Sequence, residues 1–257
     1  MVRCLEISDP NGKCTATTQL WQRMQAGTLQ MDEQSPVLLM DAPGRPAKPE
    51  LVAPRQVPRR RLGNPVGRAA LVHAIAHIEF NAINLALDAA CRFRAMPADF
   101  YTDWLSVAAD EARHYQLLQS RLLQLGYEYG DFPAHNGLWE MAQRTAGSCL
   151  ERMALVPRVL EARGLDVTPG MIKRLQQAGD DETVSILEII LVEEVRHVKI
   201  GTRWFHHCCA ERGVEPDSTF IELVSKFFGG SIRGPFNLPA RFRAGFTQQE
   251  MDAIAGK

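Results

Sequence analysis

The sequence predicts an all-α protein, and three observations support this. Long segments carry apolar residues at helical spacing, residues that start or stop helices bound these segments, and strand-like alternation is almost absent. Four of the segments run for roughly 27–33 residues, which corresponds to about 40–50 Å of helix each. We therefore expect an antiparallel four-helix bundle with an extended N-terminal arm and extra C-terminal helices.

Capping residues, prolines and glycines place the ends of these helices. Asn64 followed by Pro65 is a favoured helix start, and Gly126 favours a left-handed C-terminal cap. Thr247-Gln-Gln-Glu250 is a capping-box pattern that begins a last short helix. We expect long helices over 65–94, 97–126, 137–163 and 180–212, with a kink at Pro157 and shorter helices over 15–25, 169–178 and 217–228.

We expect three parts: residues 1–64 as a short helix and an arm, 65–212 as the bundle, and 213–257 as a helical extension. Prolines at 36, 43, 46, 49, 54 and 58 forbid a continuous helix in the arm, which must wrap over the core or stay mobile. The arm is basic, with Glu50 opposed by Arg45, Lys48, Arg55, Arg59, Arg60, Arg61 and Arg68. This run could contact phosphates of a nucleotide or RNA, but a solvated surface arm with incidental charge is the more common explanation.

Composition sets limits on the function. The formal net charge is -1 and 46 % of residues are hydrophobic, so no global charge indicates a nucleic-acid or membrane partner. The N-terminus lacks the apolar core of a signal peptide, and no apolar run reaches 18 residues. The six cysteines include no C-x-x-C pair, so the sequence does not favour a structural zinc site of the usual spacing. A chain of this size does not need disulfides, so we expect mostly reduced thiols in a cytoplasmic protein.

The most informative pattern is a Glu-x-x-His motif that occurs twice, as Glu111–His114 and as Glu194–His197. Residues three apart lie on one face of a helix, so each motif can direct a carboxylate and an imidazole at one point. A single motif of this kind is more often a surface pair or a core histidine. Two such motifs, on two of the four long helices, indicate a set of metal ligands.

A single glutamate near the middle of each remaining long helix completes a ligand set. These are Glu79 and Glu151, both in apolar surroundings where an isolated carboxylate would be costly to desolvate. On the third helix Glu140 and Glu161 are also available, but both lie near its expected ends. One Glu from each of two helices and Glu-x-x-His from the other two is the arrangement that holds two metal ions in carboxylate bundles, and its donors suit iron, with manganese as the alternative.

Other side chains have two interpretations. His73 and His77 could support the site or be satisfied core histidines, and Asp110 and Glu193 could orient the ligands or form salt bridges with neighbouring arginines. Tyr115, Trp104 and Trp204 could line a pocket or pack in the core. The run His206-His-Cys-Cys209 cannot converge on one metal, because consecutive helical residues point in different directions.

The order and spacing of these motifs resemble the ferritin-like superfamily. Within it the chain is similar to an uncharacterised family of ferritin-like proteins, and more distantly to the tRNA-modifying di-iron hydroxylase. The likeness covers roughly 65–212 and is carried by HIEFNAINLALDAACRF, DWLSVAADEARHYQLLQSRL and LEIILVEEVRHVKIGTRWF. It implies a dinuclear centre, usually iron, bridged by Glu111 and Glu194, with Glu79, Glu151, His114 and His197 as terminal ligands.

We therefore expect an oxygen-dependent oxidase or hydroxylase that acts on a small molecule or RNA, with dioxygen and an electron donor as partners and no membrane. A homodimer is one assembly that this interpretation allows. The segments at both ends favour an enzyme over a cage, whose subunits need free outer faces. The alternatives are an iron oxidation and storage protein, which predicts a large hollow oligomer, and a non-catalytic metal-binding scaffold.

Overall fold

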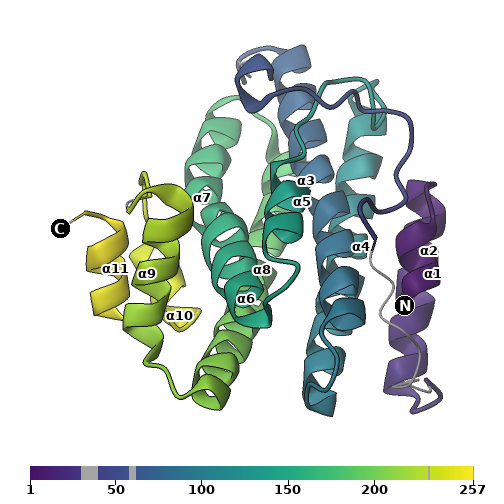
Figure 1. Ribbon diagram of the computed structural model, residues 1–257. Helices are drawn as coiled ribbons and strands as arrows, with labels where there is room; N and C mark the ends of the chain where they lie inside the picture. The colour runs from purple at the N-terminus through teal and green to yellow at the C-terminus, as the bar shows by residue number, and fades with distance from the viewer. Residues whose placement is uncertain (30–39, 58–61, 231, 257) are drawn as a thin grey trace. The chain divides into compact units, whose positions relative to one another are not determined.

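The computed structural model describes residues 1–29, 40–57, 62–230 and 232–256, and the regular elements in these ranges are helices (Figure 1). The extended backbone contributes one isolated bridge there, between Leu51 and Ala134. The all-α prediction is therefore confirmed. The chain divides into two compact units, residues 1–143 with 178–186, and residues 144–177 with 187–257.

The first unit is built on two long helices, α3 (Pro65–Arg92) and α4 (Ala98–Gln124), which pack along one another after a short connection. Asn64 Oδ1 accepts a hydrogen bond from Gly67 N at 2.6 Å, and Gly126 takes a left-handed conformation, so both predicted caps are confirmed. The unit also contains α1 (Val2–Glu6), α2 (Pro10–Gln25), nearly all of α5 (Gly137–Arg144) and the short 3-10 turn η1 (Pro54–Gln56).

Helix α3 is the core of this unit, and most of its side chains are buried from Gly67 to Cys91. By length and composition it could cross a membrane, but 78 % of its most apolar window is buried, as expected for a core helix. In the last turn of the helix, the Asp88 carboxylate accepts hydrogen bonds of 2.9–3.1 Å from Arg92.

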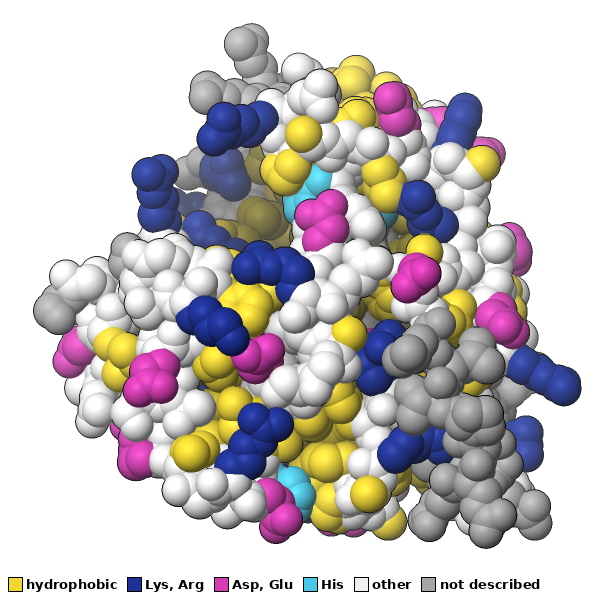
Figure 2. All heavy atoms as spheres, viewed as in Figure 1, with side chains coloured by type: hydrophobic (Ala, Val, Ile, Leu, Met, Phe, Trp, Pro, Cys, Tyr) yellow, Lys and Arg dark blue, Asp and Glu magenta, His cyan; other side chains and the backbone are white. Residues whose placement is uncertain are grey.

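The N-terminal arm lies against the first unit. The backbone of Val52 and Glu50 exchanges hydrogen bonds of 2.8 and 3.0 Å with Ala134, so described parts of the arm are fixed. Three members of the predicted basic run, Arg59, Arg60 and Arg61, lie outside the described residues. On the face drawn in Figure 2, Lys and Arg side chains are spread among Asp, Glu and hydrophobic side chains.

The second unit surrounds the greater part of α8 (Asp181–Arg212), which starts in the first unit. It also contains α6 (Cys149–Leu155), a π-helical segment η2 (Val156–Glu161) and α7 (Ala162–Gln177). The C-terminal helices are α9 (Pro216–Phe228), α10 (Leu238–Arg243) and α11 (Gln248–Ile254). The predicted capping box at Thr247 and Glu250 is confirmed.

The prediction of one continuous helix over 137–163 is wrong. The chain leaves the helix after Arg144, and Ser148 caps a new helix by accepting a hydrogen bond from Glu151 N. The predicted kink at Pro157 takes the form of the π-helical segment, whose wider turn accommodates a residue without a backbone N–H. Helix α7 then continues past Gly164 and contains Pro169, so neither residue ends or starts a helix.

Candidate metal centre

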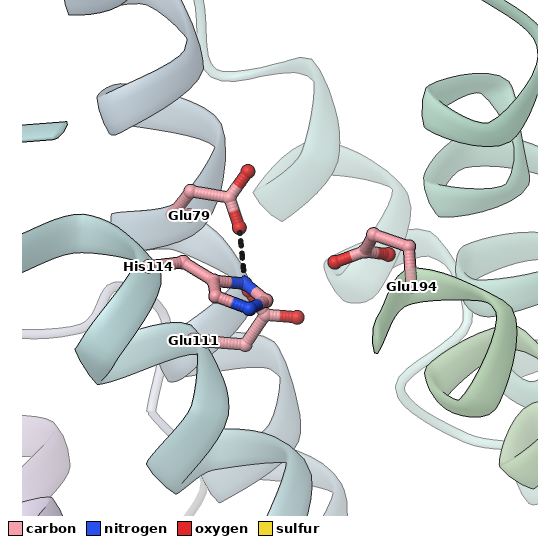
Figure 3. A group of neighbouring side chains, drawn as sticks. All are labelled: Glu79, Glu111, His114 and Glu194. Carbon is pink, nitrogen blue, oxygen red and sulfur yellow. Dashed lines mark hydrogen bonds and ion pairs between the residues drawn. The ribbon is translucent and has the colours of Figure 1, made fainter. Parts of the chain in front are cut away.

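Three of the predicted ligands come together in the first unit (Figure 3). Glu111 and His114 lie one turn apart on α4, and Glu79 faces them from α3. His114 Nδ1 is 3.3 Å from Glu79 Oε2 and 3.3 Å from Glu111 Oε2. Each residue offers a ligand atom within 4.8 Å of the others. Glu194, also labelled in Figure 3, belongs to the second unit and is described with it.

Burial makes this group electrostatically unusual. Glu79, Glu111 and His114 are 4 %, 1 % and 0 % exposed. Burial raises the pKa of Glu79 well above its usual value, and the nearby charge of Glu111 raises it further. Burial alone would lower the pKa of His114, but hydrogen bonds to Glu111 and Glu79 outweigh it and raise this pKa to about 11.

Two buried carboxylates at this distance repel one another unless a proton or a cation lies between them. The His114 proton partly fills that role in the metal-free group. Carboxylate oxygens and an imidazole nitrogen are also the donors of iron and manganese sites. The Glu79, Glu111 and His114 group could therefore bind a metal ion, and its donors fit the predicted metals.

The second Glu-x-x-His motif repeats the local geometry on α8. His197 Nδ1 is 3.2 Å from Glu194 Oε1, and His197 is fully buried while Glu194 is 9 % exposed. The spacing of three residues therefore places carboxylate and imidazole side by side on both helices. The local prediction is confirmed for each motif separately.

Glu151 is not brought to Glu194 and His197. It lies in the first turn of α6 and accepts a hydrogen bond of 2.8 Å from Lys226, whose side chain is 63 % exposed. The break before α6 is the physical reason, because it makes Glu151 a helix-start residue instead of a mid-helix residue.

The register between η2 and α8 shows what lies opposite His197. Arg212 donates a hydrogen bond to Ser148 near the start of α6, and a Cβ added at Gly201 would lie 2.4 Å from Pro157 Cγ. The two stretches therefore run antiparallel. Glu161, four residues after Pro157, is level with His197, four residues before Gly201. Glu151 is level with residues near 207, about 15 Å away along α8.

Glu161 is another carboxylate that the sequence offers, near the end of the expected helix. Its Oε2 is buried, and it is the last residue of the π-helical segment. Segments of this kind occur frequently at functional sites. Pro157 is the sequence signal for this segment.

The histidines His73 and His77 have structural partners on the side of α3 away from Glu79. His73 Nε2 accepts a hydrogen bond from Gly130 N at 2.9 Å, and His77 Nδ1 is 2.8 Å from the Tyr129 hydroxyl. The aromatic candidates in this unit pack in the core: Tyr115 contacts Phe80 and Tyr129, and Trp104 contacts Phe100.

The candidates of the second unit also have local partners. In the His206–Cys209 run, His207 packs against Trp204 with ring centroids 5.4 Å apart, while His206 packs against Phe205. The described cysteines are free thiols, as predicted. In the first unit, Asp110 and Arg113 form the salt bridge that one interpretation expected, at 3.5 Å.

Comparison with known proteins identifies the family. The family described as "Protein of unknown function (DUF455)" matches residues 6–252 of the chain. The chain belongs to this family. An uncharacterised protein of Haemophilus influenzae is 45 % identical over 260 residues, which cover 97 % of this chain and 90 % of that relative. No solved structure matches the chain. Family membership therefore supplies no activity, and the function has to be argued from the site.

Proposed function

We propose that the chain is a dinuclear metal-carboxylate protein with a ferritin-like bundle, and that it is an oxygen-dependent oxidase or hydroxylase of an organic substrate. The observation that carries this proposal is the buried group of Glu79, Glu111 and His114. Glu194 and His197 repeat half of that group on α8. Two such halves supply the carboxylates and imidazoles that two metal ions require.

The attachment of α8 to the first unit supports the joining of the two halves. Arg121 on α4 donates hydrogen bonds to Thr183 at 3.0 Å and to Asp180 at 2.8 Å, both at the start of α8. Glu111 lies ten residues before Arg121, and Glu194 lies eleven residues after Thr183. Each carboxylate therefore lies about 15 Å along its own helix from this anchor.

We assign the remaining carboxylate to Glu161 in place of Glu151. The assignment rests on the register opposite His197, on the buried Oε2 and on the π-helical segment that ends there. The proposed ligand set is Glu79, Glu111, His114, Glu161, Glu194 and His197.

Iron fits this set best, with manganese as the alternative, because oxygen donors outnumber nitrogen donors and no thiolate takes part. When bound, ferrous iron would supply the electrons that activate dioxygen. The chain's own residues hold the metals, and the burial of Glu79, Glu111 and His114 excludes bulk water from them. The substrate is an organic molecule, with RNA as an option raised by the basic arm.

The test is to load the protein anaerobically with ferrous iron, count the metals and then admit oxygen. We expect two iron ions per chain, consumption of oxygen and the absorption spectrum of a coupled diferric pair. Glu111→Gln and Glu194→Gln should each lower the metal content. Glu188→Gln is a matched control, since Glu188 is exposed on the same helix as Glu194.

A second set of variants separates the two candidates for the remaining carboxylate. Glu161→Gln is expected to lower the iron content, whereas Glu151→Gln removes only the contact with Lys226 and leaves the content unchanged. If wild-type protein binds no metal, or binds iron that oxygen does not oxidise, the proposed function is wrong. A large hollow particle in light scattering would favour the storage alternative instead.

A further inference from the structure

The first unit contains a cavity of about 140 Å³ that the metal site does not use. Its walls are the arm around Asp41 to Leu51, one face of α3, the loop with Tyr129, and Trp139 on α5. On α3 the lining residues His77, Asn81 and Asn84 share one face, at spacings of four and three. Glu79 points to the opposite face of the helix, so the cavity is a separate site.

The arm that closes this cavity is fixed by hydrogen bonds. The carbonyl of Asp41 accepts from Trp139 Nε1 at 2.9 Å and from Gln143 Nε2 at 2.6 Å. Gly44 N donates to the Leu5 carbonyl at 2.7 Å. A Cβ added at Gly44 would lie 2.2 Å from a carbonyl oxygen in α1, so this approach requires glycine. The wall is therefore part of the folded unit.

One amide oxygen among the residues that line the cavity has no hydrogen bond within the described part of the chain. Asn84 is satisfied, because its amide donates to the Phe80 carbonyl and its Oδ1 accepts from the buried Lys13. Asn81 Nδ2 donates to the His77 carbonyl at 2.8 Å, which fixes the orientation of the amide. Among the described residues, Asn81 Oδ1 has no hydrogen bond, although Asn81 is only 6 % exposed. This oxygen can therefore accept a hydrogen bond from a ligand in the cavity.

A positively charged side chain also lines the cavity. Arg45 lines the cavity and is exposed, so its guanidinium can meet a ligand without losing its hydration completely. The charge of Arg45 also acts on His77. The pKa of His77 is lowered to about 4, mainly by burial, and Arg45 is among the groups that lower it further. Asp41 also lines the cavity: its backbone carbonyl is held by Trp139 and Gln143, and its carboxylate is exposed.

Size and wall chemistry narrow the ligand class. A cavity of about 150 Å³ accommodates one benzene ring. Phe80, Tyr129 and Trp139 supply aromatic walls, and Pro43, Pro46 and Pro49 supply further apolar surface. We propose that this cavity binds a single-ring aromatic carboxylate with an N–H or O–H donor opposite the carboxylate. The donor would meet Asn81 Oδ1, and the carboxylate would meet Arg45.

The test uses three probes on the full chain, by isothermal titration calorimetry. 4-Aminobenzoate has both groups, benzoate lacks the donor, and aniline lacks the carboxylate. We expect saturable binding of one 4-aminobenzoate per chain. Benzoate and aniline should each bind about tenfold more weakly, because each leaves one charged or buried polar group without its partner.

Substitutions in the exposed arm test the proposal without changing any core residue. Arg45→Ala should weaken 4-aminobenzoate about tenfold and leave aniline unchanged. Arg55→Ala, an exposed arginine of the same arm that does not line the cavity, should change neither. The proposal is overturned if no probe saturates, if the three probes bind equally, or if Arg55→Ala has the same effect as Arg45→Ala. The result is independent of metal binding, because the experiment can be repeated on metal-free protein.

Discussion

The buried ion pair between Arg158 and Glu250 should hold the C-terminal helix to the π-helical segment. Both side chains are 0 % exposed, and Arg158 Nη2 is 2.7 Å from each carboxylate oxygen of Glu250. The guanidinium also lies 4.2–4.7 Å from the ring centroids of Phe205, Phe220 and Phe246. A charge in such surroundings depends on its single carboxylate partner.

Glu250→Gln is the informative perturbation, because it removes the charge and keeps the shape. Burial already lowers the pKa of Arg158, and the attraction of Glu250 works against this effect. Leaving a buried charge without its partner costs about 3–5 kcal/mol. For a protein of this size, that loss corresponds to a fall of roughly 6–20 °C in Tm. Arg158→Met combined with Glu250→Gln should cost less than the sum of the two single variants, because each single variant leaves one buried charge unpaired and the double variant leaves none.

Urea denaturation of the four proteins in this double-mutant cycle measures the coupling between the two residues. The exposed pair of Lys226 and Glu151 provides the control, and Lys226→Met should cost at most about 1 kcal/mol. Two results would refute the reasoning. One is a double variant as unstable as the sum of its parts, and the other is Glu250→Gln costing no more than Lys226→Met.

Three further predictions follow from the packing, the buried lysine and the metal group. Gly201→Ala should cost about 1–3 kcal/mol in denaturation because its Cβ would meet Pro157, whereas Gly164→Ala, with open space around it, should be neutral or stabilising by up to about 1 kcal/mol. Burial lowers the pKa of Lys13 to about 7. From about pH 7 to 10 the unfolded chain therefore holds a proton on Lys13 that the native chain lacks. In this range the free energy of unfolding should rise with pH, relative to that of Lys13→Met, by up to about 1.4 kcal/mol per pH unit. This rise should be absent below about pH 7. Removing metal with a chelator should lower the Tm measured by scanning fluorimetry. The loss should correspond to about 4 kcal/mol if the free metal had been at 1,000 times its Kd. Adding iron should restore the Tm, and the Tm of Glu111→Gln should not change with the chelator.

Local signals in the sequence predicted the first unit's long helices and both Glu-x-x-His pairs. Asn64, Pro65 and Gly126 act on the backbone within one turn, so their effects are visible without tertiary structure. The i,i+3 spacing likewise fixes a carboxylate beside an imidazole on any helix. Glu79 lies beside Glu111 and His114 as predicted, because α3 begins at the predicted cap and the position of Glu79 along the helix was therefore correct.

The arm and its cavity could not be predicted in the same way. Prolines indicated extended chain, but the contacts that fix it come from distant residues. Lys13 Nζ donates to the Gly44 carbonyl at 2.8 Å, and Asp41 is held by Trp139 from α5. A buried lysine gives no periodic signal in a sequence, so its partners on α3 and in the arm appear only in the folded unit.

The change from Glu151 to Glu161 shows where counting from a helix start fails. The count assumes one unbroken helix, and the break before α6 resets the register of all later residues. Pro157 allows a bend, but the close approach to Gly201 and the ion pair of Arg158 with Glu250 keep the wider turn in place. Both contacts are nonlocal, so the sequence around Pro157 could not specify them. The position of the proposed ligand Glu161 is therefore set by packing against α8 and α11, and variants that loosen that packing should affect metal content as well as stability.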